Sequence, residues 1–312
     1  MKLSELINEW LYQNHFDKIK ERSLIKYESA IRNNIIPYFG NAEIENLSPR
    51  EVQNWINFLK TKKSAKTNNV LSPSSINTVA AIMKMAFNYA VDYEIIDRNP
   101  ALRLKIQAPV YYGNVIKAFT KEEQIKLEKY IEKSKRNDYS CIILVLYTGI
   151  RLGELLALTW EDVDFENGTL KITKTAYSIK TEDGTWKYKI TKPKTRSSVR
   201  DIPLSSFIVD KLKQMRRNRK SEKILCSEDG QDLSYIAVVR RFSRLLVRLK
   251  IRPLTFHSLR HTFATRALEN NMDVKTLSEI LGHSNVSTTL NIYVHSLMEH
   301  KRNQIKKIKR LI

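Results

Sequence analysis

Histidine and arginine side chains recur near the C-terminal end of this 312-residue chain at spacings that suit phosphate chemistry. Four of the six histidines fall between positions 257 and 295. The segment His257-Ser258-Leu259-Arg260-His261 places His257 and Arg260 three residues apart, which puts them on one face of a helix. A guanidinium can bind two phosphate oxygens at once. The segment therefore predicts part of a site where cations converge on a phosphate.

Three other segments could complete such a site. Arg151, in the sequence Thr-Gly-Ile-Arg, follows an apolar stretch that we expect to be a buried helix. Lys194, in the run Lys-Pro-Lys-Thr-Arg over 192–196, is expected in the turn of a β-hairpin. His283 follows Leu-Gly, and Tyr293 stands ten residues later, beyond a run of small polar residues. Basic residues from three such elements could converge on a single phosphate.

Together these segments resemble the Arg, Lys, His-x-x-Arg, His, Tyr signature of the tyrosine recombinase family, which includes phage and conjugative-transposon integrases. The resemblance covers nearly the whole chain and is sharpened by the Gly-x-Arg-x-x-Glu and Leu-Gly-His-Ser contexts. Carried over position by position, it implies a catalytic set of Arg151, Lys194, His257, Arg260, His283 and the nucleophile Tyr293, with Glu154 as a supporting residue.

The chemistry that this resemblance implies gives each residue type a reason. Strand exchange without an energy source has to conserve the phosphodiester, and a covalent 3′-phosphotyrosyl ester at Tyr293 does so. Two guanidiniums can hold the nonbridging oxygens and stabilise the transition-state charge. Lys194 would protonate the leaving 5′-oxygen, while His257 would accept the phenol proton or orient the phosphate. His283 would donate a hydrogen bond to a nonbridging oxygen, and neither a metal nor a cofactor is expected.

Two features of this set admit another interpretation. His257 and His261 stand four residues apart and could bind zinc, but the residue after His257 is not the glutamate of a zinc protease motif, and no cysteine is near. Lys189 and Lys192 are close neighbours of Lys194 and could supply the general acid in its place. His261 is expected to have a structural role.

Composition narrows the class of partner. The net charge is +21 with a pI near 9.8, and residues 109–312 carry 39 of the 54 basic and 22 of the 33 acidic side chains. Such an excess favours nucleic acid as the partner, because phosphate neutralisation drives binding, and the resemblance implies double-stranded DNA. No apolar run approaches the roughly 18 residues that cross a bilayer. Cys141 and Cys226 are expected to be buried thiols, and the protein to be cytoplasmic and associated with the nucleoid.

The elements that must position these residues fall into two parts, and the fold class is mostly α with a small antiparallel β-sheet. Apolar periodicity over 3–11 and 24–35, with helix starts at 48 and 72, predicts a four-helix domain over 1–100. By resemblance this is the SAM-like, core-binding domain. A linker is expected over 101–119, and an α-rich catalytic domain over 120–312. Within that domain we predict strands over 169–173, 186–191 and 199–203, the first pair joined at 183–184, and helices from 205 to the end.

The resemblance implies sequential strand exchange through a Holliday junction by a homotetramer on synapsed core sites. The basic tail over 301–312 would dock onto a neighbouring protomer and serve oligomerisation. The amino-acid sequence of the helical domain favours an integrase of a mobile element. Because the chain begins at the core-binding helices, a Xer-like resolvase or an invertase stays open. A DNA-binding regulator without activity and an enzyme that relaxes DNA as topoisomerase IB does also stay open as alternatives. The use of an excisionase as accessory directionality factor stays open as well.

Overall fold

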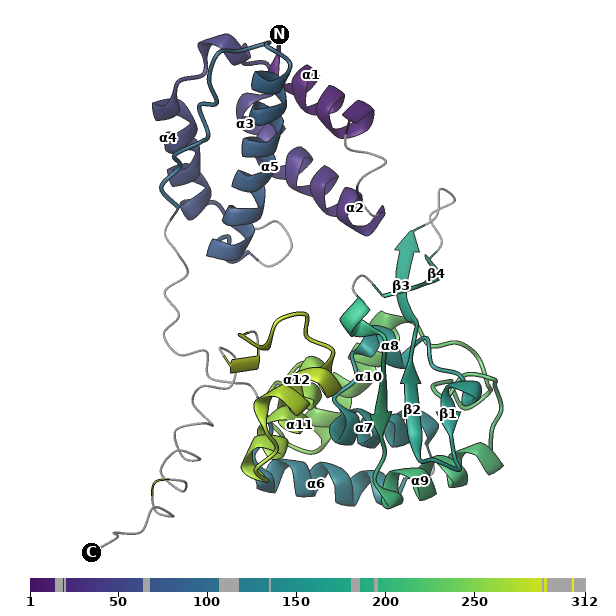
Figure 1. The fold of residues 1–312 in the computed structure, drawn as a ribbon. Coiled ribbons are helices and arrows are strands. Elements are labelled where there is room, and N and C mark those ends of the chain that lie inside the picture. Colours follow the sequence, from purple (N-terminus) through teal and green to yellow (C-terminus); the bar gives the residue numbers. More distant parts are fainter. Residues whose placement is uncertain are drawn as a thin grey trace, which may run out of the picture. The chain divides into compact units, whose positions relative to one another are not determined.

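The computed structural model describes residues 1–14, 19, 21–63, 68–106, 118–134, 136–180, 186–193, 196–287, 289–290 and 305. The chain divides into two compact units, Met1–Tyr112 and Gly113–Ile312, and each contains its own hydrophobic core (Figure 1). The predicted fold class is confirmed, because the first unit is helical and the second combines helices with small antiparallel sheets. No helix among the described residues has the length and apolar character needed to cross a membrane.

The first unit is a helical domain around one core. Its elements are α1 (Leu3–Asn8), the π-helical η1 (Glu9–Asn14), α2 (Glu21–Ala30), the π-helical η3 (Ile31–Ile35), α3 (Ile36–Phe39), the 3₁₀ turn η4 (Ile44–Asn46), α4 (Pro49–Thr61) and α5 (Pro73–Asp92). The predicted start of α4 is confirmed: Glu51 N donates to Ser48 Oγ at 3.3 Å and Ser48 N donates to Glu51 Oε2 at 2.8 Å. Trp55 and Phe87 are fully buried in the hydrophobic core of the first unit.

The two ends of the predicted linker pack against different cores. Ala101 is buried with the first unit, and Leu104 and Ile106 pack against it. Phe119 is buried in the second unit, where its backbone N–H donates to Thr262 Oγ1 at 2.9 Å. The stretch 107–117 between them lies outside the described residues, so the linker remains a prediction there.

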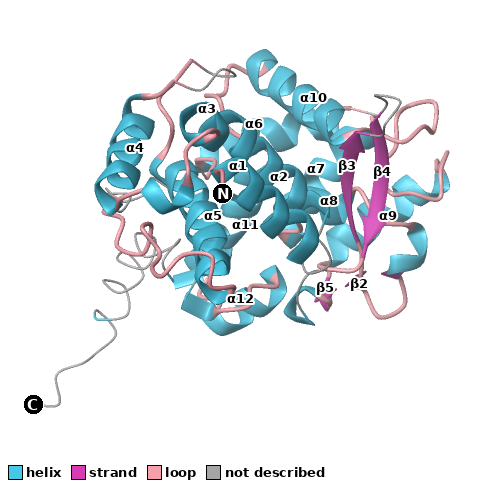
Figure 2. Cartoon of the chain, turned by 90° about the horizontal axis from the view of Figure 1, so that it is seen from above, coloured by secondary structure: helices cyan, strands magenta, loops and turns pink. Residues whose placement is uncertain are grey.

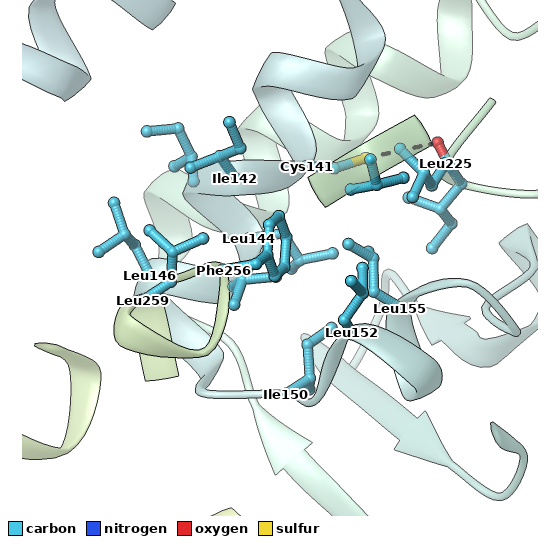
Figure 3. Packing of buried hydrophobic residues seen from close by; sticks show 14 of the residues in the cluster. Cys141, Ile142, Leu144, Leu146, Ile150, Leu152, Leu155, Leu225, Phe256 and Leu259 are labelled. Carbon is cyan, nitrogen blue, oxygen red and sulfur yellow. Dashed lines mark hydrogen bonds between the residues drawn. The ribbon is translucent and has the colours of Figure 1, made fainter. Parts of the chain in front are cut away.

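The second unit is built around one buried helix. Its helices are α6 (Lys121–Glu132), α7 (Asn137–Thr148), α8 (Leu152–Leu155), α9 (Ser206–Arg217), α10 (Tyr235–Arg248), α11 (His257–Glu269) and α12 (Val274–Leu281). Helix α7 packs against α6, α9 and α11, and Figure 3 shows its residues Leu144 and Leu146 beside Phe256 and Leu259. The buried thiol of Cys141 donates to Ile224 O in the same cluster (Figure 3). Helix α7, which ends directly before Gly149 and Arg151, is thus held by three other helices.

The sheet prediction was wrong in its pairing. The strands are β1 (Val163–Asp164), β2 (Thr169–Ile172), β3 (Thr175–Lys180), β4 (Trp186–Thr191) and β5 (Arg200–Pro203). One sheet has the order β1-β2-β5, and β3 pairs with β4 in a separate antiparallel sheet (Figure 2). The sequence prediction overlooked β3 because it follows β2 after only two residues, with no glycine or proline to mark a new strand.

This pairing moves the lysine-rich segment. Because β4 pairs with β3, residues 192–196 follow the hairpin and lead through the 3₁₀ turn η6 (Arg196–Ser198) into β5. A hairpin with these residues in its turn was predicted, but β4 pairs with β3 and β5 pairs with β2, so the two strands on either side of 192–196 do not pair with each other. Asp183-Gly184 falls between β3 and β4, and Asp183, Gly184 and Lys194 are all outside the described residues. Helices were predicted from 205 to the end, and α9 to α12 lie in this part, but 218–234 and 249–256 connect them without being helical.

Candidate active site

The predicted catalytic residues come from three places in the second unit. Arg151 caps α8 directly after α7, and Glu154 lies within α8. His257 and Arg260 lie in the first turn of α11, and His283 follows the end of α12. The structure joins Arg151, Glu154, Arg260 and His283 through a continuous set of hydrogen bonds, described below. Lys194 and Tyr293 lie outside the described residues, and their places in the site stay predictions.

The carboxyl end of α12 gathers three arginines. Three successive backbone carbonyls each accept a hydrogen bond from a different guanidinium, and the pairs are Arg200 with Ile280, Arg260 with Leu281 (2.7 Å) and Arg151 with Gly282 (3.0 Å). The last carbonyls of a helix lack partners within the helix and carry its negative dipole end. This end of α12 therefore attracts cations that would otherwise repel one another.

The turn after α12 places His283 next to these arginines. Gly282 adopts a left-handed conformation (φ 65°), and His283 N donates back to Ser278 O at 3.0 Å. A side chain at Gly282 would meet Arg200 Nη1 at 3.0 Å and Ser197 O at 3.1 Å, in addition to the strain of the positive φ. The Leu-Gly-His sequence thus fixes the direction in which His283 leaves the helix.

Glu154 is the carboxylate that binds two of the three arginines. Its side chain is 4% exposed, and Arg151 donates to it from Nη1 and from its backbone N–H, both at 2.8 Å. Arg200 donates to both carboxylate oxygens, at 3.1 and 3.0 Å. Burial acts to raise the pKa of Glu154, but the hydrogen bond and charge of Arg200, and then the charge of Arg151, outweigh it and hold the pKa below its ordinary value. Glu154 is therefore ionised at neutral pH.

His283 is bound at both ring nitrogens. Its Nε2 lies 2.8 Å from Arg260 Nη2, and its Nδ1 lies 2.7 Å from Thr289 Oγ1. A guanidinium can only donate, so Nε2 accepts, and the ring proton is on Nδ1, where it donates to the threonine hydroxyl. Burial, followed by the charges of Arg260 and Arg151, lowers the pKa of His283 to about 4. The imidazole is neutral in this state.

His257 lies one helical turn from His261, and their rings meet edge to face with centroids 4.7 Å apart. Part of the His257 surface reaches solvent. Burial of the rest of the ring, followed by the charges of His261, Arg260 and Arg151, lowers the pKa of His257 to about 4. A neutral imidazole can accept a proton. Within the described part of the chain, no three His, Cys, Asp or Glu side chains are grouped so that they could hold a metal ion.

Arg200 is a site residue that the sequence prediction missed. It was assigned only to a strand, although its side chain is 7% exposed and binds Glu154. The signal lies in the strand register: Arg200 is opposite Ile172, which is buried, and residues opposite each other in an antiparallel pair share a face. With β2 and β5 correctly paired, an arginine directed into the domain would have been expected.

Comparison with known proteins agrees with these features. A model of the phage integrase family matches residues 117–300, and a model of the phage integrase N-terminal SAM-like domain matches residues 2–60. The chain is 30% identical to a XerC-like tyrosine recombinase of Caldanaerobacter subterraneus subsp. tengcongensis, over 97% of this chain and 82% of that protein. It is 27% identical to the transposase from transposon Tn916 of Enterococcus faecalis, over 86% of this chain and 68% of that protein.

Solved structures give the same result. The integrase of transposon Tn1549, in complex with transposon right end DNA, matches with a TM-score of 0.82 at 25% identity, over 99% of both chains. The family model for the catalytic part covers more than half of this chain. The chain belongs to the phage integrase family of tyrosine recombinases.

Proposed function

We propose that this recombinase integrates and excises a mobile element by cutting and rejoining DNA at a specific site through a 3′-phosphotyrosyl ester on Tyr293. The observation that carries the proposal is the meeting of Arg151, Arg260 and His283 at the end of α12. Further support comes from the similarity to the Tn916 transposase and to the Tn1549 integrase, the latter bound to transposon end DNA.

The scissile phosphate would bind between Arg151 and Arg260. The side chain of Arg151 is 35% exposed, and three of its five N–H groups have no acceptor among the described residues. Arg260 is 2% exposed and held by Gly149 O and Leu281 O, so its guanidinium is fixed before DNA arrives. Such preorganised donors stabilise the charge of a pentavalent transition state without reorganisation.

His283 would change partners when the phosphate binds. As long as its Nε2 accepts from Arg260, it cannot donate to the DNA. A phosphate oxygen would take over the Arg260 N–H, and its negative charge would raise the pKa of His283. The ring could then carry a proton on Nε2 and donate it in a hydrogen bond to the nonbridging oxygen.

The proton steps would use neutral His257 and Lys194. Tyr293 would attack the phosphorus as its phenol proton passes to His257, and Lys194 would give a proton to the 5′-oxygen as that bond breaks. The free 5′-hydroxyl of a partner strand would reverse these steps. Two rounds in a synaptic homotetramer would pass through a Holliday junction, with an excisionase setting the direction.

A second candidate follows from one comparison. The 30% identity to a XerC-like recombinase extends over 97% of this chain, which favours a resolvase or an invertase as the runner-up. A plasmid carrying two target sites separates these functions. An integrase joins attachment sites of different sequence. A resolvase or an invertase acts on two identical sites, and it deletes or inverts the DNA between them.

A suicide substrate tests the proposed chemistry. The probe is a nicked duplex with the repeat that borders the coding sequence of this chain, so that cleavage releases a short fragment and traps the adduct. The chain is expected to form a covalent protein–DNA product, and Tyr293→Phe is expected to bind the duplex without forming it. An adduct formed by Tyr293→Phe would contradict the proposal, as would a failure of the unmodified chain to cleave any bordering repeat.

A further inference from the structure

Arg200 is buried beside the catalytic arginines, but the proposed reaction gives it no phosphate contact. It begins β5, and its side chain is 7% exposed. Nη1 and Nη2 donate to the two oxygens of Glu154, Nη1 also donates to Ser198 O, and Nε donates to Ile280 O. Four of its five N–H groups are thereby used within the protein, which suits a residue that holds other groups in place.

The contacts of Arg200 with Glu154 and Ile280 lead to members of the catalytic set, whereas the hydrogen bond to Ser198 O does not. Glu154, which Arg200 holds at both oxygens, holds Arg151 through two hydrogen bonds. Ile280 is followed by the carbonyls that accept from Arg260 and Arg151, and then by His283. Arg200 therefore connects β5 to the two elements whose relative position decides whether Arg151 and His283 meet.

The charges at this point require a balance. Three guanidiniums gather around one carboxylate and the negative end of α12. Among the residues that the structure describes, removal of Arg200 leaves Arg151 as the one ion-pair partner of Glu154. Arg151 would still bind both oxygens of Glu154, but this pair would lose its connection to β5 and to the end of α12 through Arg200. Arg200 Nη1 also lies 3.0 Å from the place of an added Cβ at Gly282, so its guanidinium packs against the turn itself.

We propose that Arg200 is a positioning residue: through Glu154 and the end of α12, it sets Arg151 and His283 to face the same phosphate. It touches no reacting atom. The part of this proposal that concerns the phosphate rests on the proposed recombinase reaction. The part that concerns geometry holds for the protein without DNA and is tested separately.

The activity test compares Arg200→Gln, Glu154→Gln and the double variant on the suicide duplex. Single-turnover cleavage at saturating DNA is expected to fall about 10²-fold in each single variant, as when one preorganised donor is lost. The Kd for the duplex is expected to change less than about threefold, because neither residue binds DNA directly. The double variant is expected to be within about threefold of either single variant, because both substitutions break one connection.

Two further variants separate positioning from general damage. Arg200→Lys keeps the positive charge but cannot bind both oxygens of Glu154 and Ile280 O together, so a loss of about tenfold is expected, and this variant carries the test if Arg200→Gln does not fold. Arg217→Gln removes an exposed arginine at the end of α9 and is expected to cleave at the unmodified rate. Losses that multiply to about 10⁴-fold in the double variant would overturn the connection through Glu154, as would a rate for Arg200→Gln within twofold of the unmodified chain.

An NMR titration of His283 in the DNA-free protein distinguishes failure of this proposal from failure of the proposed function. Arg200→Gln is expected to raise the pKa of His283 by about half a unit or more, through loss of a nearby charge and a looser turn. Arg217→Gln should leave it in place. A chain that cleaves no DNA but shows this shift would sink the recombination reaction and keep the positioning role, whereas an unchanged titration would overturn the role of Arg200.

Discussion

Thr289 Oγ1 lies 2.7 Å from Nδ1 of His283, and this hydroxyl is fully buried. Because it accepts the ring proton, it fixes the tautomer that presents Nε2 to Arg260. Thr289→Val removes the acceptor and keeps the shape of the side chain. We expect single-turnover cleavage to fall about tenfold with unchanged DNA affinity, and Thr289→Ser to restore most of it. Ser287→Ala removes an exposed hydroxyl two residues away and serves as the control; an equal loss there would contradict the tautomer role.

The lowered pKa of His283 predicts a dependence of stability on pH. Its pKa is about 4 in the folded protein, below the ordinary value of 6.5, so the unfolded chain binds more protons between these values. The stability that the protein has with a neutral His283 is fully present above pH 6.5, and it is lost progressively as the pH falls towards 4. Between pH 7 and 5 we expect His283 to account for a decrease on the order of 1–2 kcal/mol in the free energy of unfolding.

Urea unfolding of the unmodified chain and of His283→Gln at both pH values measures this effect. The variant should lose less stability on acidification than the unmodified chain. His257 and His261, whose pKa values are also lowered by burial, remain in both proteins and cancel from the difference. Equal pH dependence in the two proteins would show that His283 is not held neutral by its surroundings.

Gly149 connects the core helix to the site and tolerates no side chain. It has a φ of 66°, and an added Cβ would lie 2.5 Å from Phe263 Cδ1 and 2.7 Å from Leu281 Cδ2. Gly168 has a similar φ of 60°, but its Cβ would meet no atom closer than 3.6 Å. We expect Gly168→Ala to cost about 1 kcal/mol of stability, from the backbone alone. Gly149→Ala should cost at least about 2 kcal/mol more, because it also overpacks the core. Thermal unfolding of both variants measures which substitution costs more stability. A smaller loss for Gly149→Ala than for Gly168→Ala would contradict the prediction.

Arg151→Lys tests the need for a planar, forked cation at the phosphate. A lysine keeps the charge but cannot bind Glu154, Gly282 O and two phosphate oxygens together. Cleavage of the suicide duplex at saturating DNA should fall about 10²- to 10³-fold, while the Kd should change little because one phosphate charge contact is kept. Lys213→Arg, at an exposed position of α9, is the matched exchange and should have no effect. A rate for Arg151→Lys close to that of the unmodified chain would mean that charge alone suffices.

The sequence predicted the local features that depend on neighbouring residues. The helix starts at Ser48 before α4 and at Ser72 before α5, and the shared helical face of His257 and Arg260, follow from short-range patterns. These patterns also placed Arg151 directly after a buried helix and Arg260 within a helix, as the structure has them, whereas His283 lies beyond the end of α12 rather than in a helix. Short-range rules therefore predicted the local structure around these two arginines.

Long-range pairing was not accessible in the same way. Strand β4 pairs with β3, whereas the prediction paired it with β2. No local signal distinguishes the two arrangements. The misplaced strand hid the register of β5 and, with it, the burial of Arg200. The hydrogen bond between His283 and Thr289 likewise depends on how the chain turns after α12, which spacing alone does not fix.

Mapping the residue that is joined to DNA tests the central claim most directly. The trapped product of the suicide duplex is digested with protease and nuclease, and the peptide that carries the nucleotide is sequenced by mass spectrometry. The account predicts a single phosphodiester link between a DNA 3′-phosphate and the phenol of Tyr293. A link to any other residue, or to a 5′-phosphate, would contradict it.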